Sequence, residues 1–236
     1  MKTYYFNLQS KGGSGKSMLT YLQALKHGEN DRIAFIDLDA ASHTSARQLA
    51  FVSTKERLFQ IELLDDIKRI DREKFFKMIE GLNETAFAVF YVDFGSSESE
   101  QLLQLFKMDF SKEDLKLFEQ EMKAKFIFNI VIAGGTSYEA CFNYLKQVVL
   151  TIGGLFDLIL YANEYTFKQQ PALMSEIRDF MKSTKGLIKE SKPFGNIYTE
   201  RQSGVEIIAN IKNGLGMEGY KSFAARAIIK KEIDKI

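Results

Sequence analysis

The segment SKGGSGKS, residues 10–17, decides the fold of this chain of 236 residues. It follows the apolar run Tyr4–Leu8, and a stretch of helical pattern, Met18–Lys26, comes after it. A glycine-rich loop between a strand and a helix places backbone N–H groups at a helix N-terminus, where an anion binds well. The pattern predicts a phosphate-binding P-loop, although Ser10 stands where the usual motif begins with glycine.

Each residue type in this loop suits a nucleoside triphosphate. Gly12, Gly13 and Gly15 let successive backbone N–H groups turn toward one phosphate. Lys16 can reach the β and γ phosphates, and the hydroxyl of Ser17 can ligate magnesium directly. We therefore expect ATP and Mg²⁺ as ligands. The alternative is a glycine-rich turn that binds no nucleotide.

Short apolar runs alternate with longer helical segments over most of the chain. Five runs are too short for buried helices and are predicted to be buried parallel strands: Tyr4–Leu8, Ile33–Ile36, Phe87–Val92, Phe126–Ile132 and Phe156–Tyr161. Four other segments are long enough for crossover helices: Met18–Lys26, Glu98–Phe106, Ser137–Leu150 and Gln169–Lys182. The pattern predicts an α/β fold of the P-loop NTPase type, a mostly parallel twisted sheet with helices on both faces.

The sequence offers few signs of a domain boundary. It contains no internal repeat and no linker rich in Pro or Ser, so we expect a single domain over residues 1–236. The stretch 54–82 is charged and helical in pattern. We interpret it either as a pair of solvated helices or as a partner-binding insertion.

Three acidic residues come at the ends of predicted strands. Asp37 and Asp39 lie at the end of the second strand, and Asp93 lies at the end of the third. The carboxyl ends of parallel strands meet at one edge of a sheet, so all three acids are expected beside the P-loop. In an extended chain Asp37 and Asp39 point to the same side, which suits one acid near a metal's water shell and one near an attacking water. Helix capping is the alternative role.

The heptapeptide KGGSGKS, residues 11–17, resembles the deviant Walker A signature KGGxGK[ST] of the ParA/MinD group of ATPases. IDLDA, residues 36–40, looks like the D-x-D switch segment of that family, and YVDFG, residues 91–95, looks like its Walker B strand end. The family often has proline where Ala40 stands and a proline-containing turn where Gly95 stands. The motif order covers most of the chain and is most similar to conjugal-transfer and mobilisation (TraL-like) members.

The resemblance implies a role for each of these residues. Lys11 would reach across a dimer interface to the phosphates of the partner's ATP, while Lys16 would act within its own subunit. Asp39 would position the catalytic water, and Asp37 and Asp93 would hold magnesium through water. A cation delivered only on dimerisation stabilises the transferring phosphoryl group, as an arginine finger does.

Asn163 ends the fifth predicted strand. In the family an asparagine at this place hydrogen-bonds the adenine edge, and a carboxamide has the paired donor and acceptor that adenine needs; a turn-forming asparagine is the alternative. PFGNIYTERQSGVEIIANI, residues 193–211, resembles the family's loop and helix that close over the base. The residues expected to bind ATP are Lys11, Gly12, Gly13, Ser14, Gly15, Lys16, Ser17, Met18 and Asn163.

The charges nearly cancel, with 32 Lys and Arg against 31 Asp and Glu, which excludes a histone-like polycation. Their distribution is uneven, because residues 178–236 carry 12 Lys and Arg against 7 Asp and Glu. In the ParA branch, basic residues of this region bind DNA without sequence preference in the ATP-bound dimer. The candidates are Arg201, Lys212, Lys221, Arg226, Lys230 and Lys231. An ordinary solvated surface is the alternative.

The C-terminal stretch YKSFAARAIIKKEIDKI, residues 220–236, is amphipathic. MinD-like members bind membranes through a terminal helix, which needs bulky apolar groups and many cations. Glu232, Asp234 and the single large aromatic after Tyr220 instead favour packing against the domain. Membrane docking is therefore not expected.

Cysteine and histidine usage indicates a reducing compartment and no zinc site. Cys141 is the only cysteine, which excludes an internal disulfide, and we expect it to be a small buried residue. His27 and His43 lack the spacing of zinc ligands. The N-terminus lacks the layout of a signal peptide, and the apolar runs are too short for a membrane span. We expect a cytoplasmic protein.

Together with the resemblance, these features predict an ATP-dependent homodimer that hydrolyses ATP slowly. The dimer is expected to bind DNA or an ATPase-stimulating or cargo protein and to act in plasmid partition or conjugal transfer. One alternative is a metabolic P-loop enzyme of the dethiobiotin-synthetase-like type. Others are a MinD-like membrane-associated positioning ATPase and a nucleotide-binding structural protein that has lost hydrolysis. The last is disfavoured because the chain retains Lys11, Lys16, Ser17, Asp39 and Asp93.

Overall fold

The computed structural model describes residues 1–39 and 44–236, so Ala40 and His43 lie outside the described residues. The described residues form a seven-stranded, all-parallel sheet in the order β3-β2-β4-β1-β5-β6-β7. Its strands are β1 (Lys2–Leu8), β2 (Ile33–Asp37), β3 (Leu58–Gln60), β4 (Val89–Asp93), β5 (Ala124–Ala133), β6 (Asp157–Asn163) and β7 (Ile188–Phe194). All five predicted strands are present.

Helices cover the sheet as predicted for an α/β fold. The α-helices are α1 (Lys16–Lys26), α2 (Thr44–Gln48), α3 (Ala50–Ser53), α4 (Arg72–Glu84), α5 (Ser96–Met108), α6 (Lys112–Glu121), α7 (Tyr138–Ile152), α8 (Glu164–Phe167), α9 (Pro171–Ser183), α10 (Gln202–Lys212) and α11 (Phe223–Lys235). Two short 3-10 helices, η1 (Gly135–Ser137) and η2 (Met217–Gly219), complete them.

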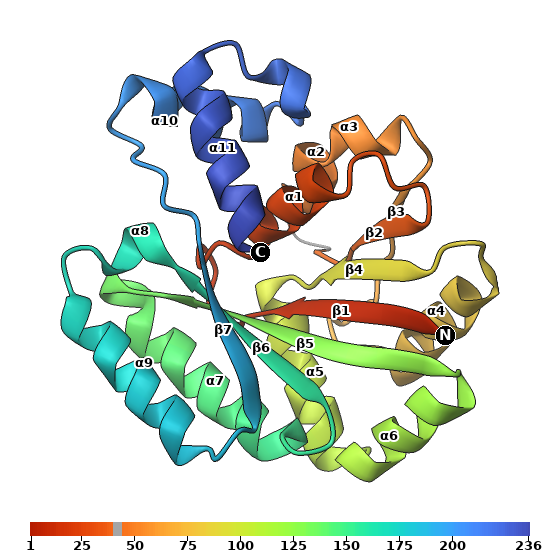
Figure 1. Cartoon of the computed structure of the whole chain (residues 1–236). Coiled ribbons are helices and arrows are strands. Elements are labelled where there is room, and N and C mark those ends of the chain that lie inside the picture. Colours follow the sequence, from red (N-terminus) through yellow and green to blue (C-terminus); the bar gives the residue numbers. More distant parts are fainter. Residues whose placement is uncertain (40–43) are drawn as a thin grey trace.

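Two hydrophobic clusters lie on opposite faces of the sheet because side chains alternate along each strand. From β1, Tyr4 and Phe6 pack into the cluster that contains residues of α4, α5, α6, α7 and α9. Tyr5 packs on the other face, where the cluster contains residues of α1, α10 and α11. Figure 1 shows α1, α10 and α11 above the sheet and α6 and α7 below it. Burial on both faces explains why the central strands are almost continuously apolar.

The strand register brings the functional motifs to one edge. Asp93 pairs with Asn7 across β4 and β1 and with Asp37 across β4 and β2. On the other side of β1, the end of β6 places Asn163 beside Phe194 of β7. Since all strands are parallel, these ends share the carboxyl edge from which the P-loop emerges.

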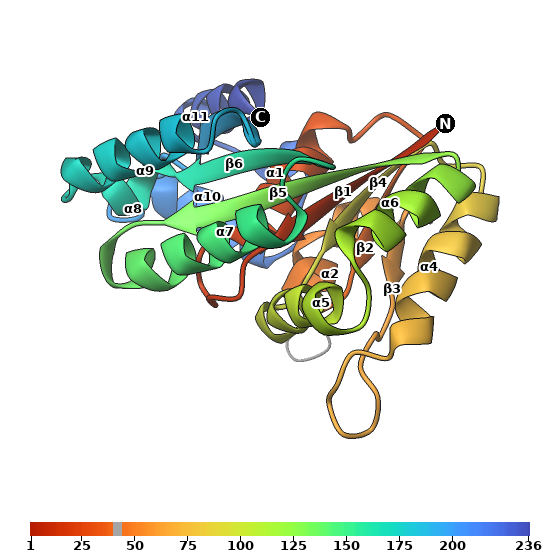
Figure 2. The ribbon, with the colours of Figure 1, turned by 90° about the horizontal axis from the view of Figure 1, so that it is seen from below.

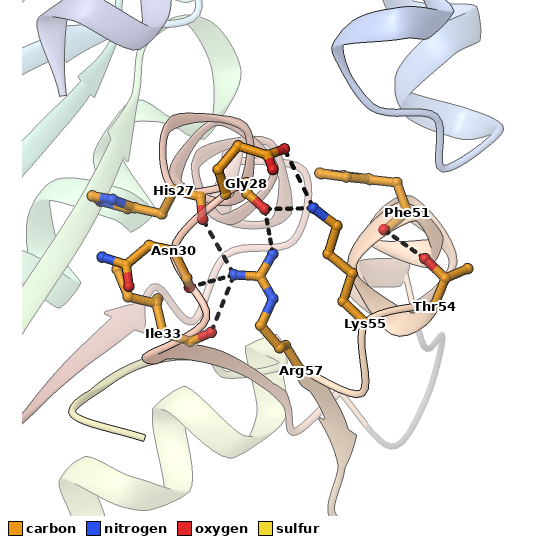
Figure 3. A network of polar contacts seen from close by, with 9 residues as sticks. His27, Gly28, Asn30, Ile33, Phe51, Thr54, Lys55 and Arg57 are labelled. Atoms are coloured by element: carbon orange, nitrogen blue, oxygen red, sulfur yellow. Dashed lines mark hydrogen bonds and ion pairs between the residues drawn. The ribbon is translucent and has the colours of Figure 1, made fainter. Parts of the chain in front are cut away.

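The prediction that residues 54–82 form a pair of solvated helices is wrong. Only Arg72 onward is helical, and Leu58–Gln60 forms the edge strand β3. The cause is Arg57, which is buried and donates hydrogen bonds to the carbonyl oxygens of Asn30 and Gly28, both at 2.6 Å (Figure 3). Its guanidinium satisfies carbonyl groups where α1 ends, so this anchor directs the following residues into the sheet.

The strand β7 was also not predicted. Only its two end residues, Ile188 and Phe194, are buried, and charged side chains occupy much of the interval. An edge strand pairs on one side only, so it needs no continuous apolar run. Pro193, near its end, also obscures the pattern.

Candidate functional site

The loop between β1 and α1 has the backbone expected of a P-loop. Gly13 and Gly15 have φ angles of 75° and 108°, in the region that favours glycine. A Cβ on Gly15 would lie 2.8 Å from Nδ2 of Asn163, so a larger residue would displace that carboxamide. Because α1 begins at Lys16, the loop ends at a helix N-terminus. The geometry is suited to an anion.

Lys16 is buried within the loop. Its Nζ donates to the carbonyl oxygen of Gln9 at 2.9 Å and to Oγ of Ser96 at 3.4 Å. Burial lowers the pKa of Lys16, and the negative charge of Asp93 opposes this shift. The ammonium group is therefore held in place by the carbonyl of Gln9, just before the P-loop, and by Ser96, the first residue of α5.

Asp93 is the most buried acid of the site. Its Oδ2 accepts hydrogen bonds from the hydroxyl of Ser17, at 3.0 Å, and from that of Ser45. Burial raises the pKa of Asp93 from 3.8 to about 6, while the charge of Lys16 opposes that rise. In the part of the chain that the structure describes, its buried Oδ1 has no hydrogen-bond partner. An orphaned carboxylate oxygen at this depth needs a donor or a cation.

These residues fit a magnesium ion. Ser17 and Asp93 offer adjacent hydroxyl and carboxylate oxygens, which are the hard donors that Mg²⁺ prefers, and Oδ1 of Asp93 is available for a metal-bound water. Ser17 as a direct ligand and Asp93 as a ligand through water therefore remain predictions that the donor chemistry supports.

The structure separates the environments of Asp37 and Asp39. Asp37 is buried, and its two carboxylate oxygens accept from the backbone N–H groups of Asp39, at 3.0 Å, and Ala46, at 2.8 Å. It thus accepts from a backbone N–H in the first turn of α2, which is the capping role considered above. Its role toward magnesium stays a prediction. Asp39 lines the cavity of the P-loop, and its Oδ1 lies 3.1 Å from the position of a Cβ on Gly95.

A cavity of about 400 Å³ brings most of the predicted phosphate-binding residues together. Its walls come from the P-loop, from the segment around α2 and from the start of α5. The lining residues are Gly12, Gly13, Ser14, Gly15, Lys16, Ser17, Met18, Asp39, Thr44, Gln48, Phe94, Gly95 and Ser96. Lys11 is exposed to solvent beside this cavity, and its backbone N–H donates to Oε1 of Gln9 at 3.2 Å. Its position leaves the side chain accessible to a second molecule.

Asn163 lies against the P-loop. Its Nδ2 donates to the carbonyl oxygen of Ser14 at 3.1 Å, and its Oδ1 lies 2.9 Å from the position of a Cβ on Gly195. Gly195 has a φ of 72°, and the same Cβ position is 3.4 Å from Sδ of Met18. The segment after β7 therefore contacts Asn163 at the end of β6 and Met18 in α1, next to the P-loop, where the resemblance places the base. Adenine contact by Asn163 remains a prediction.

Several polar residues around the cavity were not identified from the sequence. Gln9 is buried and also donates from Nε2 to the carbonyl oxygen of Val131 at 2.7 Å, so it fixes the start of the loop. Ser45, Gln48 and Ser96 supply hydroxyl or carboxamide groups from α2 and α5. Gln9 could have been predicted from the sequence, because it is a polar residue directly after an apolar strand. The positions of Ser45, Gln48 and Ser96 depend on tertiary packing and could not.

The six basic residues predicted to contact DNA are all exposed, and two of them, Arg201 and Arg226, interact with neighbouring residues of the chain. Arg201 lies over the ring of Tyr198, with 4.7 Å from Cζ to the ring centroid. Arg226 donates to the carbonyl oxygens of Tyr220 and Lys221 before α11. The others lie at the end of α10, just before α11 or on α11 itself: Lys212, Lys221, Lys230 and Lys231. Exposure is compatible with a phosphate contact and does not distinguish it from ordinary solvation.

The C-terminal helix packs against the body, as the sequence predicts. Ala225 and Ile229 are buried, and the carboxylate of Glu232 accepts from the backbone N–H of Asn196 at 3.2 Å. Lys235 forms ion pairs with Glu232 and Glu164. These contacts occupy the apolar face that membrane docking would require. Among the described residues, no helix combines the length and the apolar character needed to span a bilayer.

Cys141 lies on α7, close to the P-loop. Its side chain is fully buried and burial raises the pKa of its thiol. A buried, protonated thiol is a poor nucleophile, so the structure agrees with the packing role that the sequence predicts.

The sequence matches no protein-family profile and no curated protein. Solved structures, in contrast, are similar over nearly the whole chain. MinD cell division protein from Aquifex aeolicus superposes with a TM-score of 0.57 at 13% identity, covering 99% of this chain and 96% of MinD. The MinC:MinD cell division protein complex from the same organism gives 0.56 at 12% identity, covering 99% and 95%.

A putative plasmid partition protein from Borrelia burgdorferi B31 bound to AMPPNP gives a TM-score of 0.50 at 15% identity. The match covers 100% of this chain and 99% of that protein. At these identities the likeness shows the fold. It confirms the predicted α/β architecture as the one that MinD and this partition protein share.

Proposed function

We propose that this chain belongs to the ParA/MinD group and is an ATP-dependent switch: ATP and magnesium join two subunits, and slow hydrolysis separates them. The contact that carries the proposal is the hydrogen bond of Ser17 to Asp93 beside the buried ammonium of Lys16. It combines a phosphate-binding cation with the hydroxyl and carboxylate of a magnesium site. The shared fold with MinD supports it.

In this proposal the chain's own residues divide the work of phosphoryl transfer. Lys16 and the loop N–H groups hold the phosphates, and Asp39, which lines the same cavity, orients the attacking water. Magnesium, when bound, neutralises charge on the β and γ phosphates. Ser17 and Asp93 would hold it. The proposed base site lies beside Asn163, where this side chain meets the P-loop and the segment after β7.

Lys11 is assigned to the partner's active site. Its exposed side chain contrasts with buried Lys16, although both belong to the same short loop. A cation that faces solvent in one subunit reaches a phosphate only when a second subunit is opposite it. Hydrolysis would then depend on dimerisation.

The biological task that we propose is plasmid or DNA partitioning or conjugal transfer, in the cytoplasm. The ATP dimer would present the basic residues of α10 and α11 twice, which strengthens weak non-specific DNA contacts. An ATPase-stimulating or cargo protein would complete the system. The similar Borrelia burgdorferi protein, described as a putative plasmid partition protein, supports this task.

Mixing two inactive variants tests the assignment of Lys11. Lys11→Ala and Asp39→Ala should each bind ATP and release little phosphate. In a mixed dimer, the Lys11→Ala subunit keeps Asp39 and receives Lys11 from its partner, so one of the two sites regains both groups. We expect phosphate release to reappear on mixing, in the presence of Mg²⁺.

If the mixture releases phosphate no faster than the separate variants, Lys11 does not act in trans. Hydrolysis by Lys11→Ala alone at the parent rate would lead to the same conclusion. A metabolic ligase of the same fold would turn over ATP only when a small-molecule acceptor is added, which distinguishes it from the proposed switch.

A further inference from the structure

A groove of about 550 Å³ lies between α5 and the loop formed by residues 61–71, outside the phosphate cavity. It is bounded by the loop on one side and by one face of α5 on the other. Its lining residues are Lys68, Arg69, Ile70, Arg72, Gln101, Gln104, Leu105, Met108 and Asp109. Figure 2 shows the loop projecting from the body between β3 and α4.

The loop is a preformed wall. The carboxylate of Asp65 accepts from the backbone N–H groups of Ile67, at 3.0 Å, and Arg69, at 2.8 Å. Leu64 and Ile70 form an antiparallel bridge that closes the loop at its base. These bonds hold the backbone of Arg69 in one conformation, so its side chain starts from a fixed point on the wall.

Gln101 fastens this wall to α5. Its Oε1 accepts from the backbone N–H of Ile70 at 2.8 Å, and its Nε2 donates to the carbonyl oxygen of Lys68 at 3.0 Å. The same helix begins at Ser96, whose hydroxyl accepts from Lys16 in the phosphate cavity. A molecule bound in the groove would therefore contact the helix that also lines the phosphate cavity.

The groove combines apolar surface with positive charge. Met108, which lines the groove together with Ile70, is 82% exposed. Lys68, Arg69 and Arg72 line the groove against one carboxylate, that of Asp109, which pairs with Arg72 at 2.9 Å. A solvent-exposed methionine beside guanidinium groups favours a ligand that offers both apolar and acidic side chains.

The loop's other acids do not cancel this charge within the groove. Asp65 accepts from the backbone of its own loop, and Asp71 accepts from the backbone N–H groups of Glu73 and Lys74 at the start of α4. Oε1 of Glu62 lies 3.6 Å from Nζ of Lys68, and neither Glu62 nor the exposed Asp66 lines the groove. Nucleic acid is a poorer fit, because Leu105 and Met108 would face phosphates and Asp109 would repel them.

We propose that this groove docks an acidic amphipathic segment of a partner protein, with apolar anchors against Met108 and carboxylates against Arg69 and Arg72. The docking itself does not depend on the proposed ATPase activity. The proposal gives a defined binding surface to the earlier interpretation of residues 54–82 as a partner-binding insertion.

A pair of synthetic peptides tests the proposal by fluorescence anisotropy with the full chain. One peptide carries Leu and Glu at helical spacing, and its twin carries Lys in place of every Glu. We expect saturable binding of the acidic peptide and none of the twin. Arg69→Glu and Met108→Glu should each weaken the acidic peptide by about tenfold or more.

Two matched variants serve as controls. Arg178→Glu on α9 repeats the charge reversal, and Leu150→Glu on α7 likewise replaces an exposed apolar side chain with Glu. Both lie elsewhere on the surface and should leave binding unchanged. Circular dichroism and binding of a fluorescent ATP analogue check that all four variants fold and keep the nucleotide site. The proposal is overturned if the acidic peptide does not bind, or if the control variants weaken its binding as much as the groove variants do. It is also overturned if the chain binds duplex DNA through Arg69 and does not bind the peptide there.

Discussion

The surroundings of Asp93 and the basic surface of α10 and α11 show two ways in which one chain uses charge. Asp93 is buried among Ser17, Ser45 and Lys16, and each neighbour alters its hydrogen bonding or its pKa. Lys230 and Lys231 of α11 are exposed to solvent, whereas other residues of that helix, such as Ala225 and Ile229, are buried. Buried charges depend strongly on their partners, whereas exposed charges act weakly and additively.

The largest effect is expected at Lys16. Lys16→Ala removes the buried cation that we propose to bind the phosphates, so ATP affinity should fall by about a hundredfold or more. A fluorescent ATP analogue measures the change. Lys182→Ala, at an exposed position of α9, is the matched control and should bind as the parent does. Equal affinity of the two variants would place the nucleotide elsewhere.

A smaller effect, of about 1 to 3 kcal/mol, is expected from the titration of Asp93. Its pKa is raised to about 6 in the folded chain, so the folded state binds more protons than the unfolded state between about pH 4 and 6. Its contribution to the free energy of unfolding is therefore favourable at low pH and is lost as pH rises through 6.

Asp93→Asn isolates this contribution, because the asparagine does not titrate. Urea unfolding of the nucleotide-free protein at pH 4.5 and 7 gives the quantity that matters, the difference between parent and variant at each pH. The variant should gain stability relative to the parent at the higher pH. A difference that does not change with pH would contradict a raised pKa at Asp93.

The smallest effect is expected from the exposed lysines. Replacing Lys230 and Lys231 with Ala should weaken binding of the ATP form to duplex DNA a few-fold and lower the salt slope by about 0.9 for each phosphate that the variant no longer neutralises. Lys182→Ala with Lys185→Ala is the matched pair on another surface. If both pairs have the same effect, or if the parent does not bind DNA, the surface of α11 is ordinary solvated protein.

The sequence predicted features that depend on local residues and missed features that depend on contacts between distant segments. The P-loop and the central strands were predictable because glycine positions and apolar runs report local constraints. Residues 54–82 were misjudged, since Arg57 acts through distant carbonyl groups such as that of Gly28. Ser45 was missed for a similar reason, because its bond to Asp93 joins segments that are 48 positions apart.

Asp37 shows a further limit of sequence reasoning. Its spacing from Asp39 suggested equivalent positions in an extended chain, but the strand ends at Asp37 and its carboxylate is used by the backbone of the next segment. Periodicity predicts side-chain direction only while the strand continues.

Sedimentation of the Asp39→Ala protein tests the central claim most directly. An ATP-dependent switch that cannot position the attacking water should accumulate as a dimer with Mg²⁺ and ATP and remain a monomer with ADP. The account predicts that difference, and Lys11→Ala should abolish it. A sedimentation coefficient that is the same with ATP, with ADP and without nucleotide would contradict the account.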